Sequence, residues 1–155
     1  MNQAATGANT GANWANAFTS LQSALDIAIN GDEIWIAAGL YKPSKDNTGN
    51  SNPANSRAKT FLLQRNLSLY GGFLGNESSL DQRDWNVNLT VLSGDLAGDD
   101  NTDVNGIVLD WSDIVGTDNC YNVVVEWNVT CTLDGLVITA GMGDKNAIVS
   151  VPGRI

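Results

Sequence analysis

The sequence predicts an all-β protein, namely a single-stranded parallel β-helix, or solenoid, of about four to five coils with a short N-terminal capping α-helix. Three observations lead to this fold class. A motif of apolar, any, apolar, any, any, glycine recurs along the chain. The spacing of its copies indicates a repeat of about 22 residues, which is typical of solenoids. The apolar period changes from 3.6 to 2 after one helical segment near the N-terminus.

The N-terminal segment predicts a leader followed by one helix. Residues 1–13 are rich in Asn, Ala, Gly and Thr and lack an apolar run, so we expect a flexible leader. Thr19 and Gln22 have the spacing of a capping box, and Gly31 follows as a stop signal. We expect a capping helix over residues 19–30 that covers the first coil. Its apolar face consists of Leu21, Ala24, Leu25 and Ala28.

The repeat motif defines the expected coils. Its copies start 33, 22 and 47 residues apart, at Ile34, Leu67, Leu89 and Leu136. A coil of about 22 residues explains these steps if the first contains an insertion and the last spans two coils. Residues 107–111 or 121–125 then supply the missing copy. Stacked coils bury a column of apolar side chains in one domain over residues 14–155, and the recurring glycine marks a corner that requires positive φ.

Two long segments between the copies predict inserted loops, and residues 116–119 predict a third, short one. Residues 42–59 are rich in Asn, Ser, Pro and Lys, and residues 97–105 are acidic. Insertions in a solenoid project from one face and often carry function.

The acidic segment contains the candidate metal site. Asp99, Asn101 and Asp103 have the one-three-five spacing of a calcium-binding loop, and Asp95 lies shortly before them. Ca²⁺ is therefore the cofactor that the sequence suggests. Val104 stands where an EF-hand requires glycine, so a solvated polar loop without metal is the alternative.

Composition restricts the function. The net charge of −9 at pH 7 repels phosphate groups, so we expect no nucleic-acid partner. The sequence contains no histidine, which excludes His-based triads and His-containing zinc sites. No apolar stretch approaches the roughly 18 residues of a transmembrane helix, so we expect no membrane insertion.

Cys120 and Cys131 form either a disulfide or two buried thiols.

Two tryptophans are candidate ligand-binding residues. Trp111 and Trp127 alternate with apolar neighbours, so we expect their rings to point outward, where they could bind a sugar or a partner protein. Packing in the core or between subunits is the alternative for these rings and for the other three tryptophans.

Several runs resemble one bacterial family. These runs are Asn-Trp-Ala-Asn-Ala-Phe at 13–18, Gly-Asp-Glu-Ile-Trp-Ile-Ala-Ala-Gly at 31–39, Tyr-Gly-Gly-Phe at 70–73, Asp-Gln-Arg-Asp-Trp at 81–85 and Leu-Asp-Gly-Leu-Val-Ile-Thr at 133–139. They are similar to segments of large surface proteins with pectate-lyase-like β-helix repeats, such as polymorphic outer-membrane proteins. The resemblance implies a right-handed β-helix with an N-terminal cap and an extracellular or cell-surface location.

Two function classes follow. The first is a non-catalytic secreted or cell-surface module, a scaffold or an adhesion-type binder of protein or glycan, for which no catalytic residue is expected. The alternative is a pectate-lyase-like carbohydrate-active enzyme. Asp95 could pair with Asp99 or Asp100 in a hydrolase, and Arg83 is the nearest base for a lyase. Carboxylates that converge beside Arg83 or Lys59 would favour the enzyme.

The end of the repeat predicts self-association. After Gly141 the motif stops, so the last coil exposes a strand edge that needs a cover. Val149, Val151 and Ile155 could supply it. A second subunit could also do so, and we expect a homo-oligomer that pairs through this end.

Overall fold

Eight short strands and one α-helix make up the regular structure of the computed structural model, which describes residues 1–143. The helix, α1, spans Leu21–Ile27. The strands are β1 (Glu33–Ala37), β2 (Gly39–Tyr41), β3 (Phe61–Leu63), β4 (Ser68–Phe73), β5 (Thr90–Ser93), β6 (Val124–Glu126), β7 (Thr132–Asp134) and β8 (Leu136–Thr139). Short 3-10 helices lie in the connections: η1 (Ser56–Ala58), η2 (Leu80–Gln82) and η3 (Trp111–Asp113).

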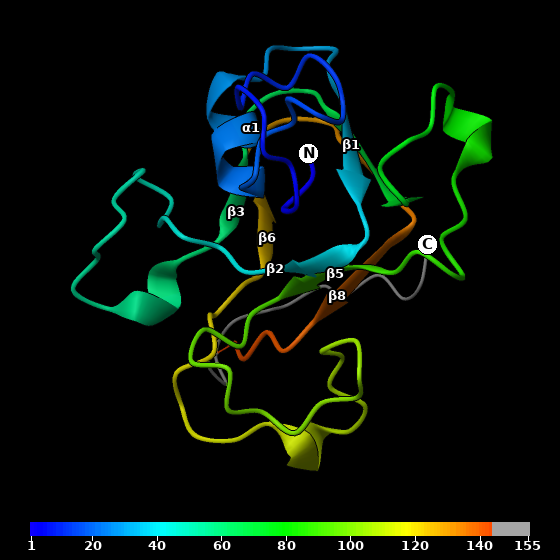
Figure 1. Cartoon of the computed structure of the whole chain (residues 1–155). Helices are drawn as coiled ribbons and strands as arrows, with labels where there is room; N and C mark the ends of the chain where they lie inside the picture. Colours follow the sequence, from blue (N-terminus) through cyan, green and yellow to red (C-terminus); the bar gives the residue numbers. More distant parts are fainter. Residues whose placement is uncertain (144–155) are drawn as a thin grey trace.

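The strands pair in parallel in three small sheets. In the described part of the chain, two sheets have three strands, in the orders β1-β4-β7 and β2-β5-β8, and the third pairs β3 with β6. Figure 1 shows the sheets on different sides of a common interior, with α1 beside β3. Parallel neighbours need long connections, which explains why loops make up so much of the chain.

This architecture corrects the predicted fold class. The prediction of an all-β, single-stranded parallel β-helix of four to five coils is wrong, because residues 1–143 form three separate sheets of at most three strands beside one α-helix. The period of about 22 residues is wrong as well. Ile34 pairs with Leu69, 35 residues later, and Val91 pairs with Val137, 46 residues later.

The repeat misled this prediction because its copies belong to different sheets. The copies that begin at Ile34 and Leu67 lie in β1 and β4, whereas those that begin at Leu89 and Leu136 lie in β5 and β8. A short strand with one buried face followed by a turn has the same pattern in any sheet. Of the two candidates for a missing copy, residues 107–111 contain no strand and residues 121–125 overlap β6.

The recurring glycine has the expected positive φ in two of the four copies. Gly39 has a φ of 150° and Gly72 a φ of 92°. Gly94 acts differently, because a Cβ at this position would collide with the carbonyl oxygen of Ala140 and lie 2.7 Å from Cys120 Sγ. At Gly94 the absence of a side chain therefore lets two segments approach closely.

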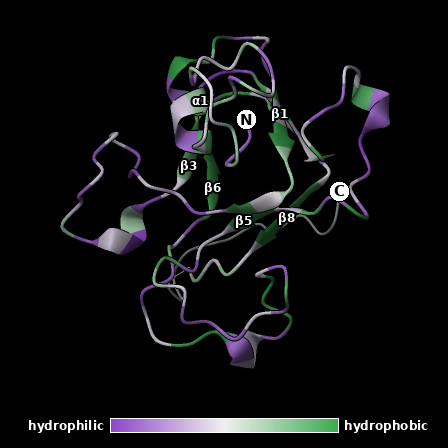
Figure 2. Cartoon of the chain, in the orientation of Figure 1, coloured by the Kyte–Doolittle hydropathy of each residue, from purple (hydrophilic) through white to green (hydrophobic). Residues whose placement is uncertain are grey.

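The hydrophobic core lies where the three sheets and α1 meet. Strands of all three sheets contribute side chains with no exposed surface: Ile36, Leu63, Leu69 and Leu92. Figure 2 shows apolar residues along the strands and polar residues in the projecting loops. Truncating a buried leucine to alanine typically costs about 2–5 kcal/mol, so these side chains dominate the stability of the fold.

The first residue packs against β1, within the segment 1–13 for which the sequence predicts a flexible leader. Met1 is buried, and its amino group donates to the carbonyl oxygen of Trp35 at 2.6 Å. Its own carbonyl oxygen accepts from the N–H of Ala37 at 3.0 Å. The N-terminal segment is therefore part of the same folded unit as the sheets.

Helix α1 is shorter than the predicted 19–30. Ser20 is its N-cap, and the expected capping box of Thr19 and Gln22 is not formed. Ala28 already has an extended ψ of 146°, which ends the helix. The helix buries Leu21, Gln22, Ala24 and Leu25.

The two predicted loops lie outside the sheets. Residues 42–59 contain η1, and residues 97–105 belong to a longer irregular segment between β5 and β6 that also contains η3. Val149, Val151 and Ile155, which were expected to cover the last coil, lie outside the described residues.

Candidate cation site and aromatic groove

Asp95 anchors the acidic segment two residues after β5. It is 5% exposed, and its Oδ1 accepts hydrogen bonds from the backbone N–H of Gly98 at 2.5 Å and of Asp99 at 3.3 Å. These bonds fold the chain after β5 into a tight turn. The other carboxylate oxygen, Oδ2, lies 3.6 Å from Lys42 Nζ.

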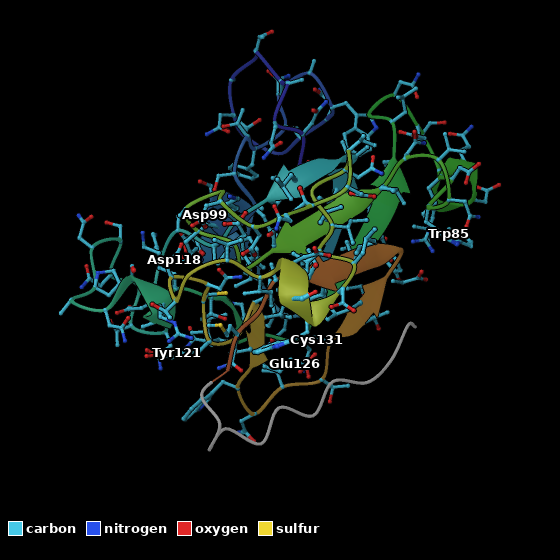
Figure 3. All side chains as sticks on the ribbon, turned by 90° about the horizontal axis from the view of Figure 1, so that it is seen from below. Trp85, Asp99, Asp118, Tyr121, Glu126 and Cys131 are labelled. Atoms are coloured by element: carbon cyan, nitrogen blue, oxygen red, sulfur yellow. The ribbon has the colours of Figure 1, made fainter. Side chains whose placement is uncertain are left out.

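Three carboxylates converge at this turn and form the acidic cluster: Asp95, Asp99 and Asp100. One oxygen from each lies within 4.8 Å of the others. Asp118 approaches from the far end of the loop, since a Cβ at Gly116 would lie 3.0 Å from Asp118 Oδ1 and 3.6 Å from Asp99 Oδ2. Figure 3 shows Asp99 and Asp118 on the same side of the molecule. The arrangement concentrates negative charge around a few oxygen atoms.

Asn119 places a buried amide beside the acidic cluster. Its side chain is fully buried, and Nδ2 donates to Asp100 Oδ2 at 2.7 Å and to the carbonyl oxygen of Ala140 at 2.9 Å. Its Oδ1 accepts no hydrogen bond within the described residues. A buried oxygen without a donor costs about 1–3 kcal/mol, and a bound ion or water is a common way to satisfy it.

The structure separates the four predicted metal ligands. Asp95 and Asp99 lie in the acidic cluster, whereas Asp103 caps its own turn by accepting from the N–H of Asn105 and Ile107. The hydrogen bond from Ile107 lowers the pKa of the Asp103 carboxyl. Asn101 is held through its backbone, whose N–H donates to the carbonyl oxygen of Asp113 at 2.9 Å. The one-three-five spacing therefore does not describe this loop.

Lys42, Asp118 and Asn119 were missed by sequence reasoning. They reach the acidic cluster from other parts of the chain, so no local spacing connects them to it. The one available signal was the polar run Gly116-Thr117-Asp118-Asn119 just before a buried cysteine.

Arg57 joins the loop of residues 42–59 to residues 119–121. Its Nε donates to the backbone oxygen of Asn119 at 2.8 Å, and its guanidinium group lies 4.2 Å from the centre of the Tyr121 ring. Asn55 Nδ2 also donates to the Tyr121 hydroxyl at 2.8 Å. The loop of residues 42–59 therefore fixes the backbone beside the acidic cluster.

Arg83 lies away from the acidic cluster. It donates to Asp134 Oδ2 at 2.8 Å and to the carbonyl oxygen of Gly71 at 3.3 Å. Its guanidinium group lies about 5 Å from the rings of Tyr70 and Trp85. Figure 3 shows Trp85 on the side of the molecule opposite Asp99. The basic group beside Asp95 is Lys42, which is neither of the two basic residues whose position was to favour an enzyme.

The two predicted ligand-binding tryptophans are both exposed. Trp111 begins η3 and is 75% exposed, and Trp127 follows β6 and is 66% exposed. Neither ring lines the groove described below.

A groove of about 640 Å³ opens between residues 10–18, α1 and β1. Aromatic and aliphatic side chains line most of it, including Trp14, Phe18, Ile27, Ile34 and Trp35. Three acidic residues also line it: Asp32, Glu33 and Glu77. A volume of this size matches pockets that bind small molecules.

The tryptophan rings of the groove are held in place. Trp35 stacks on Phe73 with 4.8 Å between ring centres and 10° between planes, and Trp14 lies 5.4 Å from the same ring. Trp14 Nε1 donates to the carbonyl oxygen of Glu77, and Trp35 Nε1 donates to Glu33 Oε2. Rings fixed in this way lose little conformational entropy when a ligand binds.

The two cysteines are free thiols. Cys120 is buried, whereas Cys131 is half-buried. The disulfide left open by the sequence is therefore not formed.

Comparisons with family models, with curated proteins and with solved structures find no match to this chain. In the described residues, no helix has the length and apolar character needed to cross a membrane.

Proposed function

We propose that this chain is a non-catalytic secreted or cell-surface module that binds a neutral glycan in the groove beside β1. The observation that carries the proposal is the pair of fixed rings, Trp14 and Trp35, in a groove that also contains carboxylates. The resemblance of the sequence to bacterial surface proteins supports the location.

The lining of the groove suits the two kinds of surface on a sugar. Indole rings offer flat apolar faces to the C–H groups of a pyranose, and indoles combine such contacts with rigid geometry. The carboxylate of Glu33 and the amide of Asn13 can exchange hydrogen bonds with hydroxyl groups. A few polar groups in a mostly apolar pocket fix the orientation of a ligand.

Charge distinguishes neutral glycans from acidic ones. Three of the lining residues are acidic and none is Lys or Arg. The whole chain also carries a net charge of −9. A polyuronate would be repelled by this surface, whereas a neutral oligosaccharide would not.

A glycan array with neutral and acidic oligosaccharides tests the proposal, followed by calorimetry of the best ligand. Ile27→Arg is the blocking variant, because Ile27 lines the groove and is 63% exposed, so the change fills the groove without altering the core. We expect binding to fall by about tenfold or more.

Trp111→Ala and Trp127→Ala are the controls, and we expect both to bind as the parent does. If these two variants lose binding and Ile27→Arg keeps it, the glycan site lies at the exposed tryptophans and not in the groove. Selective binding of polyuronates would contradict the proposed ligand class.

A second candidate function is a calcium-dependent polysaccharide lyase, and one observation favours it. Lys42 Nζ lies 3.6 Å from Asp95 Oδ2, so a basic group does meet the acidic cluster. Incubation with polyuronates and calcium, followed by ultraviolet detection of the unsaturated product, tests this function. We expect no product. Product formation that is lost in Lys42→Met would establish the lyase.

A further inference from the structure

The acidic cluster and Lys42 lie outside the groove that is proposed to bind a glycan. We propose that the cluster of Asp95, Asp99 and Asp100 binds Ca²⁺. The ion displaces the Lys42 ammonium group from Asp95, and the Asn119 amide, whose nitrogen faces Asp100 in this structure, turns so that its oxygen becomes a further ligand.

The spacing of the carboxylate oxygens suits this ion. Ca²⁺ binds oxygen ligands at about 2.3–2.6 Å, so two ligands of one ion lie at most about 5 Å apart. One oxygen from each of the three carboxylates lies within 4.8 Å of the others. Ca²⁺ also tolerates irregular ligand geometry, whereas Mg²⁺ requires a near-ideal octahedron.

Asn119 provides the second, independent observation. Its side chain is fully buried, and its amide touches the acidic cluster because Nδ2 donates to Asp100 Oδ2 at 2.7 Å. Its Oδ1 accepts no hydrogen bond within residues 1–143. Amide oxygens are common Ca²⁺ ligands, and coordination would satisfy this atom.

Lys42 occupies the position of a counter-ion. Asp95 uses Oδ1 for the backbone N–H groups of Gly98 and Asp99, which leaves Oδ2 for a cation. The distance of 3.6 Å between Lys42 Nζ and this oxygen is too long for a hydrogen bond. The Lys42 side chain is also 30% exposed, so it can turn to solvent when a metal ion arrives.

Charge determines the expected effect of Lys42. The single positive charge of Lys42 does not balance the negative charges of three neighbouring carboxylates, and a divalent ion balances them better. The ammonium group competes with the ion for Asp95 and repels it. Removing the charge of Lys42 should therefore strengthen Ca²⁺ binding, the opposite of what a lysine with a purely structural role would show.

Calorimetric titration of the full chain with calcium chloride tests this, with Lys42→Met as the main variant. We expect Lys42→Met to bind Ca²⁺ about tenfold more tightly than the parent chain. Lys45→Met is the matched control, since Lys45 comes from the same loop and pairs at 2.6 Å with Asp26, outside the cluster. It changes the net charge equally, and we expect it to leave the affinity unchanged.

Asp99→Asn removes an exposed carboxylate of the cluster, and we expect it to weaken binding about tenfold. Glu126→Gln is its charge-matched control on β6, with no expected effect. Equal affinities of the parent and Lys42→Met, or equal gains in Lys42→Met and Lys45→Met, would refute the displacement. An absence of both heat and a thermal shift at millimolar calcium in the parent and in Lys42→Met would refute the site itself.

Discussion

Arg83 lies in the connection between β4 and β5 and ties this connection to the sheet of β1, β4 and β7. Its side chain is 8% exposed and bonds Asp134, at the end of β7, and Gly71, in β4. Lysine cannot reproduce this forked geometry, so we expect Arg83→Lys to lower the free energy of unfolding by about 1–2 kcal/mol. Urea denaturation measures the change. Arg65→Lys is the control, because among residues 1–143 the Arg65 side chain makes one long bond, at 3.4 Å to the carbonyl oxygen of Leu25. Equal losses in the two variants would contradict a special role for Arg83.

The two thiols should differ in reactivity. Burial raises the pKa of Cys120 from the usual 9.0 to about 12, and burial also raises the pKa of Cys131. Because the thiolate is the reactive form and Cys120 is the more buried residue, we expect iodoacetamide at pH 8 to label Cys131 first. Mass spectrometry of partially labelled protein identifies the site. Faster labelling of Cys120 would show that this part of the core opens readily.

The pKa of Cys120 also gives a pH dependence of stability. The unfolded thiol ionises near its usual pKa of 9.0, whereas the folded thiol ionises near 12. The contribution of the buried neutral thiol is therefore complete below pH 9 and is lost as the pH rises toward 12. Cys120→Ser removes this thiol, so comparing its unfolding profile with that of the parent across this range isolates the effect.

At the scale of single elements, the sequence predicted the positions of strands better than it predicted which strands pair with each other. Alternation within the motif copies found β1, β4, β5 and β8. The strands β2, β3 and β7 have three residues each, which is too short for a recognisable period. Sheet membership depends on contacts between segments that are tens of residues apart, and a linear pattern does not contain them.

The candidate site was predictable to a similar degree. Asp95 and Asp99 stand in an evidently acidic run, and the sequence singled them out. Asn119 reaches Asp100 across 19 residues, and Lys42 reaches Asp95 from another loop. Local spacing predicted Asp103, which accepts from the backbone N–H groups of Asn105 and Ile107, whereas the turn after β5 brings Asp100 together with Asp95 and Asp99.

Helix α1 should stabilise the fold through one face. Leu25 is buried in the core cluster, whereas Ile27, on the same helix, is 63% exposed. We expect Leu25→Ala to lower the free energy of unfolding by about 2–4 kcal/mol and Ile27→Ala by less than about 0.5 kcal/mol. Urea denaturation of both variants provides the comparison. A similar cost for the two would mean that α1 is not anchored through Leu25.

At the scale of the whole molecule, β6, β7 and β8 form one end of the three sheets. Within residues 1–143, each of them pairs with one neighbour only. The strands β1, β2 and β3 lie at the opposite end, where Met1 bonds the backbone of β1. Ile138 on β8 is 48% exposed. Unpaired strand edges with exposed apolar side chains favour association with another chain.

We therefore predict that the protein forms a dimer through this end of the sheets. Light scattering coupled to gel filtration should show a mass that rises with concentration toward twice that of the chain. Ile138→Lys places a charge beside the open edge of β8 and should shift the equilibrium to monomer. Val87→Lys is the control, because Val87 is 74% exposed and lines a hollow with β2, which lies at the end of its sheet opposite β8. A constant monomer mass at all concentrations would refute this association.

Because like charges oppose contact between acidic chains, the dimer should also strengthen as salt screens the net charge of −9.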